Sequence, residues 1–144
     1  MAAAESLPCL TQDGIPISLL ANLGRPEEVE QIGIHNLLGV GLFRPEFMFL
    51  ESRERPGFET QCEIYTQVAK ALDGRRLVIR TFDLGREKQP PFLASQQSGP
   101  HPSRHLQGLR FSLAERLLFE TQLRAIVQVA QTADETTRHP NKTP

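Results

Sequence analysis

The sequence has few cysteines, almost no net charge and no long apolar run, and each of these features argues against a class of protein. Its two cysteines, Cys9 and Cys62, lack the spacing of a metal site or of a disulfide framework. The formal net charge of −1 gives no support to a partner that is nucleic acid or a membrane surface. No stretch reaches the roughly 18 apolar residues of a membrane-spanning helix, and the first residues lack the basic and apolar regions of a signal peptide. We therefore expect a cytoplasmic location.

Short apolar runs alternate with amphipathic stretches along most of the 144 residues, a length that suits one domain. The apolar runs predict strands at residues 17–23, 40–43 and 77–79. Apolar positions spaced by three and four predict helices, which cover residues 26–38, 58–72 and 112–131. The third helix carries a capping-box pattern, with Ser112 at its start and Glu115 three positions later. This alternation indicates an α/β fold with a parallel sheet.

Three segments lie outside the alternating pattern. We expect residues 1–16 to form a flexible leader. Residues 132–144 are polar and have no periodicity, which predicts a disordered tail. Residues 89–104 are rich in proline, serine and glutamine and predict a long surface loop. The folded domain is therefore expected to span residues 17–131.

An arginine follows two of the apolar runs, at the point where each predicted strand ends. These residues are Arg44 and Arg80. The carboxyl ends of parallel strands meet in one crevice, where ligands bind. Two guanidinium groups there suit a small anion, because each can hold a phosphate or carboxylate by two parallel hydrogen bonds. The nearby acids Glu46 and Asp83 are candidates to orient these arginines. The alternative interpretation is that Arg44–Glu46 and Arg80–Asp83 are structural ion pairs that close the strand ends.

Four blocks of the sequence lie in order within residues 17–130 and read ANLGRPEEVE, GVGLFRPEFMFLE, YTQVAKALDGRRLVIRTFDLGREK and LRFSLAERLLFETQLRAI. Together they resemble the phosphoenolpyruvate (PEP)-binding domain of Enzyme I of the sugar phosphotransferase system. The resemblance to pyruvate phosphate dikinase and PEP synthase is more distant. The resemblance implies a partial (β/α)₈ TIM barrel, with the first three βα units present. It also implies PEP as ligand, magnesium as cofactor, and phosphoryl transfer to a histidine of a separate domain.

The resemblance also implies roles for individual residues. The family's second block usually reads GLFRTEF and its third VIRTxDIGGDK, and their phosphate-binding arginines match Arg44 and Arg80. The aspartate and lysine of the third block match Asp83 and Lys88. The candidate supporting residues around the two arginines are Glu46, Asp83, Lys88, Arg104 and Arg110.

The sequence departs from the family's usual motifs at three places. Gln107 stands where the family has a further PEP-binding arginine, and losing that charge should weaken binding by roughly 1.5 to 3 kcal/mol. Arg104 is a candidate to compensate. Pro45 replaces a threonine, which removes a hydroxyl and an N–H beside the phosphate. Arg86 and Glu87 replace glycine and aspartate, so the loop lacks the backbone conformational freedom that glycine would give it there.

The family's magnesium-binding acids and its catalytic cysteine belong to later strands that these 144 residues do not include. No phosphohistidine motif surrounds any of the four histidines, so we interpret them as solvated or packing residues. A whole barrel takes about 250 residues, and three units leave an open strand edge that invites pairing with another chain. We therefore expect a fragment or degenerate remnant that self-associates or has marginal stability.

Two functions fit these expectations. The first is a segment of a PEP-protein phosphotransferase that contributes phosphate-binding arginines and is catalytically incomplete by itself. The second is a non-catalytic interaction module that pairs with itself, or with an intact relative, through its open barrel edge. Saturable PEP binding that is lost in Arg80→Ala would favour the first function.

Overall fold

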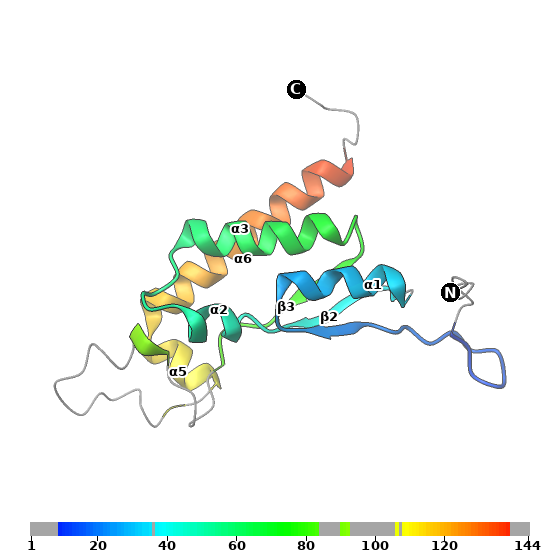
Figure 1. The fold of residues 1–144 in the computed structure, drawn as a ribbon, viewed down its shortest axis with the longest axis horizontal. Helices are drawn as coiled ribbons and strands as arrows, with labels where there is room; N and C mark the ends of the chain where they lie inside the picture. The colour runs from blue at the N-terminus through cyan, green and yellow to red at the C-terminus, as the bar shows by residue number, and fades with distance from the viewer. Residues whose placement is uncertain (1–8, 36, 84–89, 93–105, 107, 139–144) are drawn as a thin grey trace.

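Three short parallel strands form the centre of the fold. A computed structural model describes residues 9–35, 37–83, 90–92, 106 and 108–138. The strands β1 (Ala21–Leu23), β2 (Gly39–Phe43) and β3 (Arg76–Ile79) form one sheet in the order β1-β2-β3 (Figure 1). Val40 of β2 pairs with Ala21 on one side and with Leu77 on the other. The predicted α/β class with parallel strands is confirmed, and three strands in sequence order are consistent with part of a barrel.

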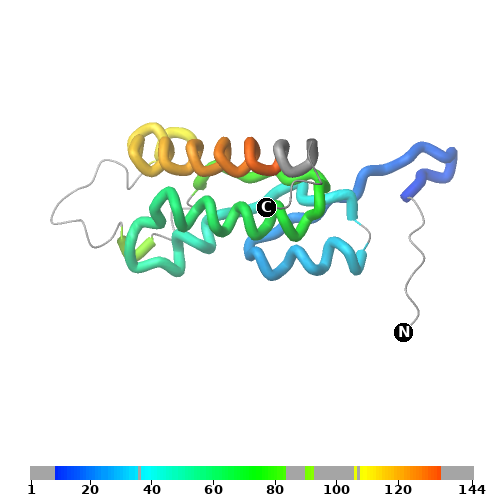
Figure 2. The backbone as a smooth tube through the Cα atoms, turned by 90° about the horizontal axis from the view of Figure 1, so that it is seen from above, coloured from blue at the N-terminus to red at the C-terminus, as the bar shows by residue number. Residues whose placement is uncertain are grey.

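Helices connect the strands and lie side by side along the sheet (Figure 2). A 3₁₀ helix, η1 (Pro26–Val29), and α1 (Glu30–Ile34) join β1 to β2. Next come α2 (Glu46–Glu51) and α3 (Phe58–Ala71), which lead to β3. After β3 the chain forms α5 (Gly108–Ala114) and α6 (Arg116–Arg138), and α6 packs along α3. Proline in the first turn of η1 and two acids beside it begin the first crossover, as the sequence predicts.

The larger hydrophobic core lies between the sheet and the helices. Its buried residues come from β1, β2 and the helices η1, α1, α3 and α6, and include Leu23, Val29, Ile32, Val40, Phe43, Tyr65, Val68 and Ala125. Leu77 and Ile79 of β3 pack against this core. Because successive strand residues point to opposite faces, Val78 and Asn22 lie on the other face, where Val78 is half-buried and Asn22 is exposed.

A second core lies beyond the carboxyl ends of the strands. It consists of aromatic and leucine side chains that follow β2 and β3, namely Phe49, Phe82, Phe92, Phe111 and Leu118. The rings of Phe49 and Phe82 pack in a tilted arrangement at a centroid distance of 4.3 Å, and the rings of Phe82 and Phe111 lie 5.7 Å apart. This core holds α2, the segment after β3, and α5 together next to the strand ends.

Several predicted boundaries differ from those of the structure. The first strand begins at Ala21 rather than at residue 17, because the ladder with β2 starts there; the bond from the Leu38 N–H to the Leu19 carbonyl at 2.9 Å precedes the strand without extending it. The last helix continues to Arg138, so disorder from residue 132 is wrong for residues 132–138. Neither glycine nor proline interrupts that segment, and the hydroxyl of Thr132 bonds the carbonyl of Gln128 within the helix.

Two further predictions fail in part. Ser112 does not cap the last helix, because it lies inside α5, where its hydroxyl donates to the carbonyls of Phe82 and Gly108. The predicted surface loop 89–104 contains Phe92, which is only 3% exposed and belongs to the second core. Most of that loop, the first eight residues of the leader and the last six residues of the tail lie outside the described residues. The domain limits and the flexibility of the leader stay predictions.

Candidate functional site

Arg44 and Arg80 lie at the same end of neighbouring strands, as the sequence predicts. Arg44 comes directly after β2, and its N–H donates to the carbonyl of Leu23 at 2.8 Å. Arg80 comes directly after β3, and its N–H donates to the carbonyl of Phe43 at 3.0 Å. Each arginine thus continues the backbone hydrogen bonding of the sheet by one residue. Both side chains meet residues of α2: Arg80 contacts Glu46, and Arg44 lies against the ring of Phe47.

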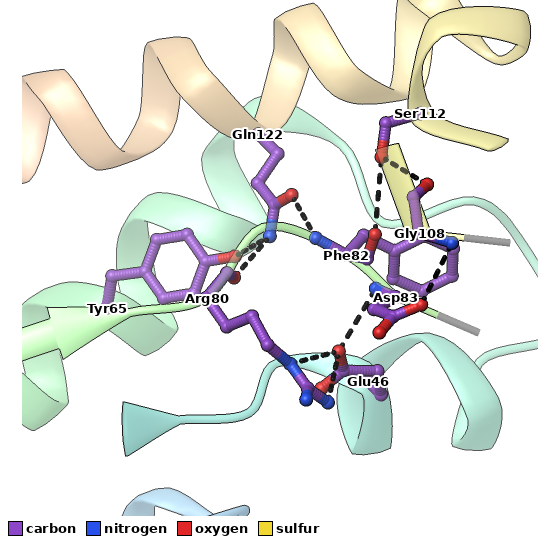
Figure 3. A network of polar contacts seen from close by, with 8 residues as sticks. All are labelled: Glu46, Tyr65, Arg80, Phe82, Asp83, Gly108, Ser112 and Gln122. Carbon is purple, nitrogen blue, oxygen red and sulfur yellow. Dashed lines mark hydrogen bonds and ion pairs between the residues drawn. The ribbon is translucent and has the colours of Figure 1, made fainter. Parts of the chain in front are cut away.

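Glu46 joins the ends of β2 and β3. It is the first residue of α2 and is only 7% exposed. One carboxylate oxygen, Oε1, accepts from Nε of Arg80 at 3.0 Å and lies 2.8 Å from Nη2 of the same guanidinium. That oxygen also accepts from the backbone N–H of Asp83 at 3.0 Å (Figure 3). In the described residues Arg80 therefore pairs with Glu46, rather than with Asp83 as the ion-pair alternative supposes.

Asp83 connects this pair to α5. Its Oδ1 accepts the N–H of Gly108 at 3.1 Å (Figure 3). Gly108 has a φ of +53°, a conformation that glycine adopts without strain. Asp83 therefore acts as a structural bridge between the end of β3 and the start of α5, instead of an ion-pair partner for Arg80.

Arg44 lies against an aromatic ring and has an unused donor. Its guanidinium carbon is 5.6 Å from the centroid of Phe47, a cation–π contact. Its Nε is buried, and in the described part of the chain it has no hydrogen-bond partner; the same holds for Oε2 of Glu46. Buried polar atoms are normally satisfied, so the Arg44 Nε–H is a candidate donor to a further acceptor, whereas Oε2 of Glu46 is an acceptor and needs a donor.

The loop after β1 closes the other side of Arg44. Glu28 accepts the N–H groups of Gly24 at 2.7 Å and Arg25 at 3.0 Å. These backbone hydrogen bonds, together with the positive charges of Arg44 and Arg25, lower the pKa of Glu28. A Cβ on Gly24 would come within 2.6 Å of the ring of Phe47, so only glycine fits there without displacing the ring.

Buried polar side chains of α3 and α6 support the segment after β3, and sequence reasoning missed them. Gln122 accepts the N–H of Phe82 at 2.7 Å and donates to the hydroxyl of Tyr65 at 3.2 Å (Figure 3). Burial raises the pKa of Tyr65, so its hydroxyl stays protonated. The available signal was positional: Gln122 interrupts an apolar stripe of α6 formed by Leu118, Ala125 and Val129.

The remaining predicted residues are less informative. Arg110 lies exposed on α5. Pro45 is buried at the N-cap of α2, where it makes no side-chain capping bond. The other departures and candidates, namely Arg86, Glu87, Lys88, Arg104 and Gln107, lie outside the described residues. His35 is exposed at the end of α1, and Cys62 packs against the larger core, where burial raises its thiol pKa.

Residues 1–140 match the family described as PEP-utilising enzyme, PEP-binding domain. The chain belongs to this family. The phosphoenolpyruvate-protein phosphotransferase of Staphylococcus epidermidis is 33% identical over 121 residues, which is 84% of this chain and 21% of that protein. That of Haloferax volcanii is 38% identical over 125 residues, 86% of this chain and 22% of the relative. The multiphosphoryl transfer protein of Xanthomonas campestris is 38% identical over 130 residues, 90% of this chain and 15% of the relative.

The chain thus spans 15% to 22% of the length of these relatives. Within the described ranges, no three or more His, Cys, Asp or Glu side chains are grouped so that they could hold a metal ion. Glu46 and Asp83 are engaged by Arg80 and by backbone N–H groups, so the described acids do not fit the magnesium that the family resemblance implies. Among the described helices, none combines the length and the apolarity that crossing a membrane requires.

Proposed function

We propose that the chain forms part of the PEP site of a phosphoenolpyruvate-protein phosphotransferase, in which Arg44 and Arg80 bind the phosphate group. The contact between Arg80 and Glu46 carries this proposal. Glu46 engages Nε and Nη2 of the guanidinium through one oxygen. The edge formed by Nη1 and Nη2 keeps donors for a second contact, and a phosphate matches its geometry. The side chain of Arg80 is 36% exposed, so an anion can reach it.

Arg44 supports the same ligand from the neighbouring strand. Its Nε is buried and lacks an acceptor among the described residues, so a phosphate would bind the outer guanidinium nitrogens and would reach Nε only through a shift of the side chain. Phe47 holds the guanidinium by its ring face, which leaves the donors at the guanidinium edge free to bind. Two arginines from adjacent strand ends would then share one small anion.

We further propose that these 144 residues alone do not complete phosphoryl transfer. Transfer needs the charge on the moving phosphoryl group to be neutralised, for which two arginines are insufficient. The described acids do not form a metal site, and the chain covers about a fifth of the relatives' length. The chain therefore contributes ligand binding, and further residues supply the chemistry.

A titration with PEP tests the role of the arginines. We expect the chain to show saturable NMR shifts with PEP, centred on the Nε–H signals of Arg44 and Arg80. Arg80→Ala should weaken binding by at least about tenfold, because a charged, two-point contact is lost. Arg116→Ala is the matched control, since Arg116 is 83% exposed on α6 and pairs only with Glu120 among the described residues. Equal affinity in the parent and Arg80→Ala chains would refute the proposal.

One observation favours a second candidate, an interaction module. β1 and β3 each have a single neighbour in the described sheet, and Leu42 and Val78 on the face opposite the helices are only half-buried. An open parallel edge of this kind pairs readily with another chain. Sedimentation velocity over a concentration series distinguishes the candidates: a module of this type forms dimers without PEP, whereas a monomer that binds PEP supports only the first function.

A further inference from the structure

We infer that Gln122 of α6 is a positioning residue for Arg80, so that the helical layer sets the geometry of the anion site. This inference rests on the proposed function, because it concerns how one of the two arginines is held. Gln122 is fully buried and lies within the apolar stripe of α6, where a hydrocarbon side chain would be expected.

The amide of Gln122 holds the backbone on both sides of Thr81. Its Oε1 accepts the N–H of Phe82 at 2.7 Å, and its Nε2 lies 3.4 Å from the carbonyl oxygen of Arg80 (Figure 3). β3 ends at Ile79, and in the described part of the chain the N–H of Arg80 makes the last hydrogen bond of the strand pairing. One side chain therefore fixes the direction in which the chain leaves the sheet, and with it the direction of the Arg80 side chain.

The orientation of that amide is set by a relay of buried polar groups in α3. Nε2 of Gln122 also donates to the hydroxyl of Tyr65 at 3.2 Å, and this hydroxyl donates to Oε1 of Gln61 at 3.4 Å. Nε2 of Gln61 donates to the carbonyl of Pro56 at 3.0 Å. Gln61, Tyr65 and Gln122 are all fully buried, and each has its partners. A buried polar network that is satisfied in this way is rigid, because any rotation leaves a donor or acceptor without a partner.

The contact with Glu46 completes the positioning from the other side. Gln122 fixes the backbone of Arg80 from above the sheet, and Glu46 fixes its Nε and Nη2. Phe82 is held at both backbone groups, because its carbonyl accepts from the hydroxyl of Ser112. The free edge of the guanidinium is thus aimed by two groups that lie on α6 and α2.

A first experiment measures Arg80 directly. In the ¹⁵N-labelled chain, the Nε–H of Arg80 should exchange slowly with solvent because it donates to Glu46. Gln122→Ala should raise that exchange rate by about tenfold or more, since the backbone that carries the side chain is released. Val129→Ala controls for destabilisation, because Val129 is a buried residue of α6 in the larger core whose side chain has no polar atom to join the hydrogen bonds of this relay. Gln128→Ala, at an exposed position of the same helix, controls for the effect of replacing a glutamine of α6 by alanine.

A second experiment uses a double-mutant cycle on PEP affinity, with Gln122→Ala, Arg80→Ala and the double variant. If Gln122 acts through Arg80, replacing Gln122 weakens PEP binding in the parent chain by about tenfold and adds no further loss once the Arg80 side chain is absent.

Rapid exchange of the Arg80 Nε–H in Val129→Ala as well as in Gln122→Ala would overturn the inference, because general destabilisation would then explain the effect. If Arg80→Ala loses binding and Gln122→Ala keeps it, only the inference fails. If Arg80→Ala keeps full affinity, the proposed function fails and the inference fails with it.

Discussion

Arg80 binds the buried carboxylate of Glu46 through two nitrogens, with Nε 3.0 Å and Nη2 2.8 Å from the same oxygen. The backbone N–H of Asp83 adds a third donor to that oxygen at 3.0 Å. Glu46 begins α2 shortly after β2, whereas Arg80 and Asp83 follow β3. A single carboxylate therefore ties two neighbouring strand ends together and takes up one edge of a guanidinium.

We expect Glu46→Gln to lower the free energy of unfolding by about 1 to 3 kcal/mol, because a neutral amide accepts weaker hydrogen bonds from a guanidinium than a carboxylate does. Urea unfolding monitored by circular dichroism measures the change. Glu51→Gln is the matched control: Glu51 is 61% exposed and pairs with Arg25, which is 55% exposed, so its loss should be at most about 1 kcal/mol. Equal losses in the two variants would contradict the structural role of Glu46.

Gly24→Ala should destabilise the chain by about 1 to 3 kcal/mol, because the added Cβ would lie 2.6 Å from the ring of Phe47 and force that ring to move. The ring also packs against the guanidinium of Arg44, so the Nε–H signal of Arg44 should shift in the variant's NMR spectrum.

Gly33→Ala should have the opposite effect on stability from Gly24→Ala. Gly33 lies in α1, and a Cβ there meets no atom within 4 Å. Alanine should therefore stabilise the chain by roughly 0.5 to 1 kcal/mol through its higher helix propensity. A stabilising effect of Gly24→Ala in the same unfolding experiment would show that Phe47 moves without cost.

The strand ends and their arginines could be predicted from the sequence, because apolar runs mark buried strands and parallel strands end at one edge. The partner of Arg80 could not be predicted. Spacing alone puts Asp83 three positions from Arg80, whereas Glu46 is 34 positions away and reaches it only because α2 begins beside the end of β3. Pairing between elements depends on packing that local patterns do not encode.

The role of Gln122 was hidden for a related reason. Its partners are a backbone N–H that lies 40 positions away and a hydroxyl that lies 57 positions away. A glutamine in an amphipathic helix usually indicates its solvent-exposed side, so residue type alone argues against burial, although the helical period puts Gln122 on the same stripe as Leu118 and Ala125. The length of α6 was also underestimated, because polar residues can continue a helix after its apolar stripe ends.

The stability supplied by Glu28 should depend on pH. The N–H groups of Gly24 and Arg25 favour its charged form and hold its pKa below the ordinary value of 4.5. This contribution is therefore complete well above pH 4.5, and it is lost as the pH falls through the lowered pKa of the folded state. We expect the parent and Glu28→Gln chains to differ most in unfolding free energy near neutral pH and to converge in acid. Glu28→Asp keeps the charge but shortens the reach, so it should behave like Glu28→Gln near neutral pH.

Arg80→Lys separates charge from geometry at the proposed phosphate contact. A lysine keeps the positive charge, but its single ammonium group cannot bind Glu46 through one edge and a phosphate through another. We expect the ammonium to remain with Glu46, so that PEP affinity falls by about tenfold, close to the loss in Arg80→Ala. The unfolding free energy should fall much less than in Arg80→Ala, because the ion pair with Glu46 is kept. Calorimetric titration with PEP and urea unfolding of the two variants measure both quantities. Full PEP affinity in Arg80→Lys would mean that charge alone is sufficient, and that the free guanidinium edge is not what binds the phosphate.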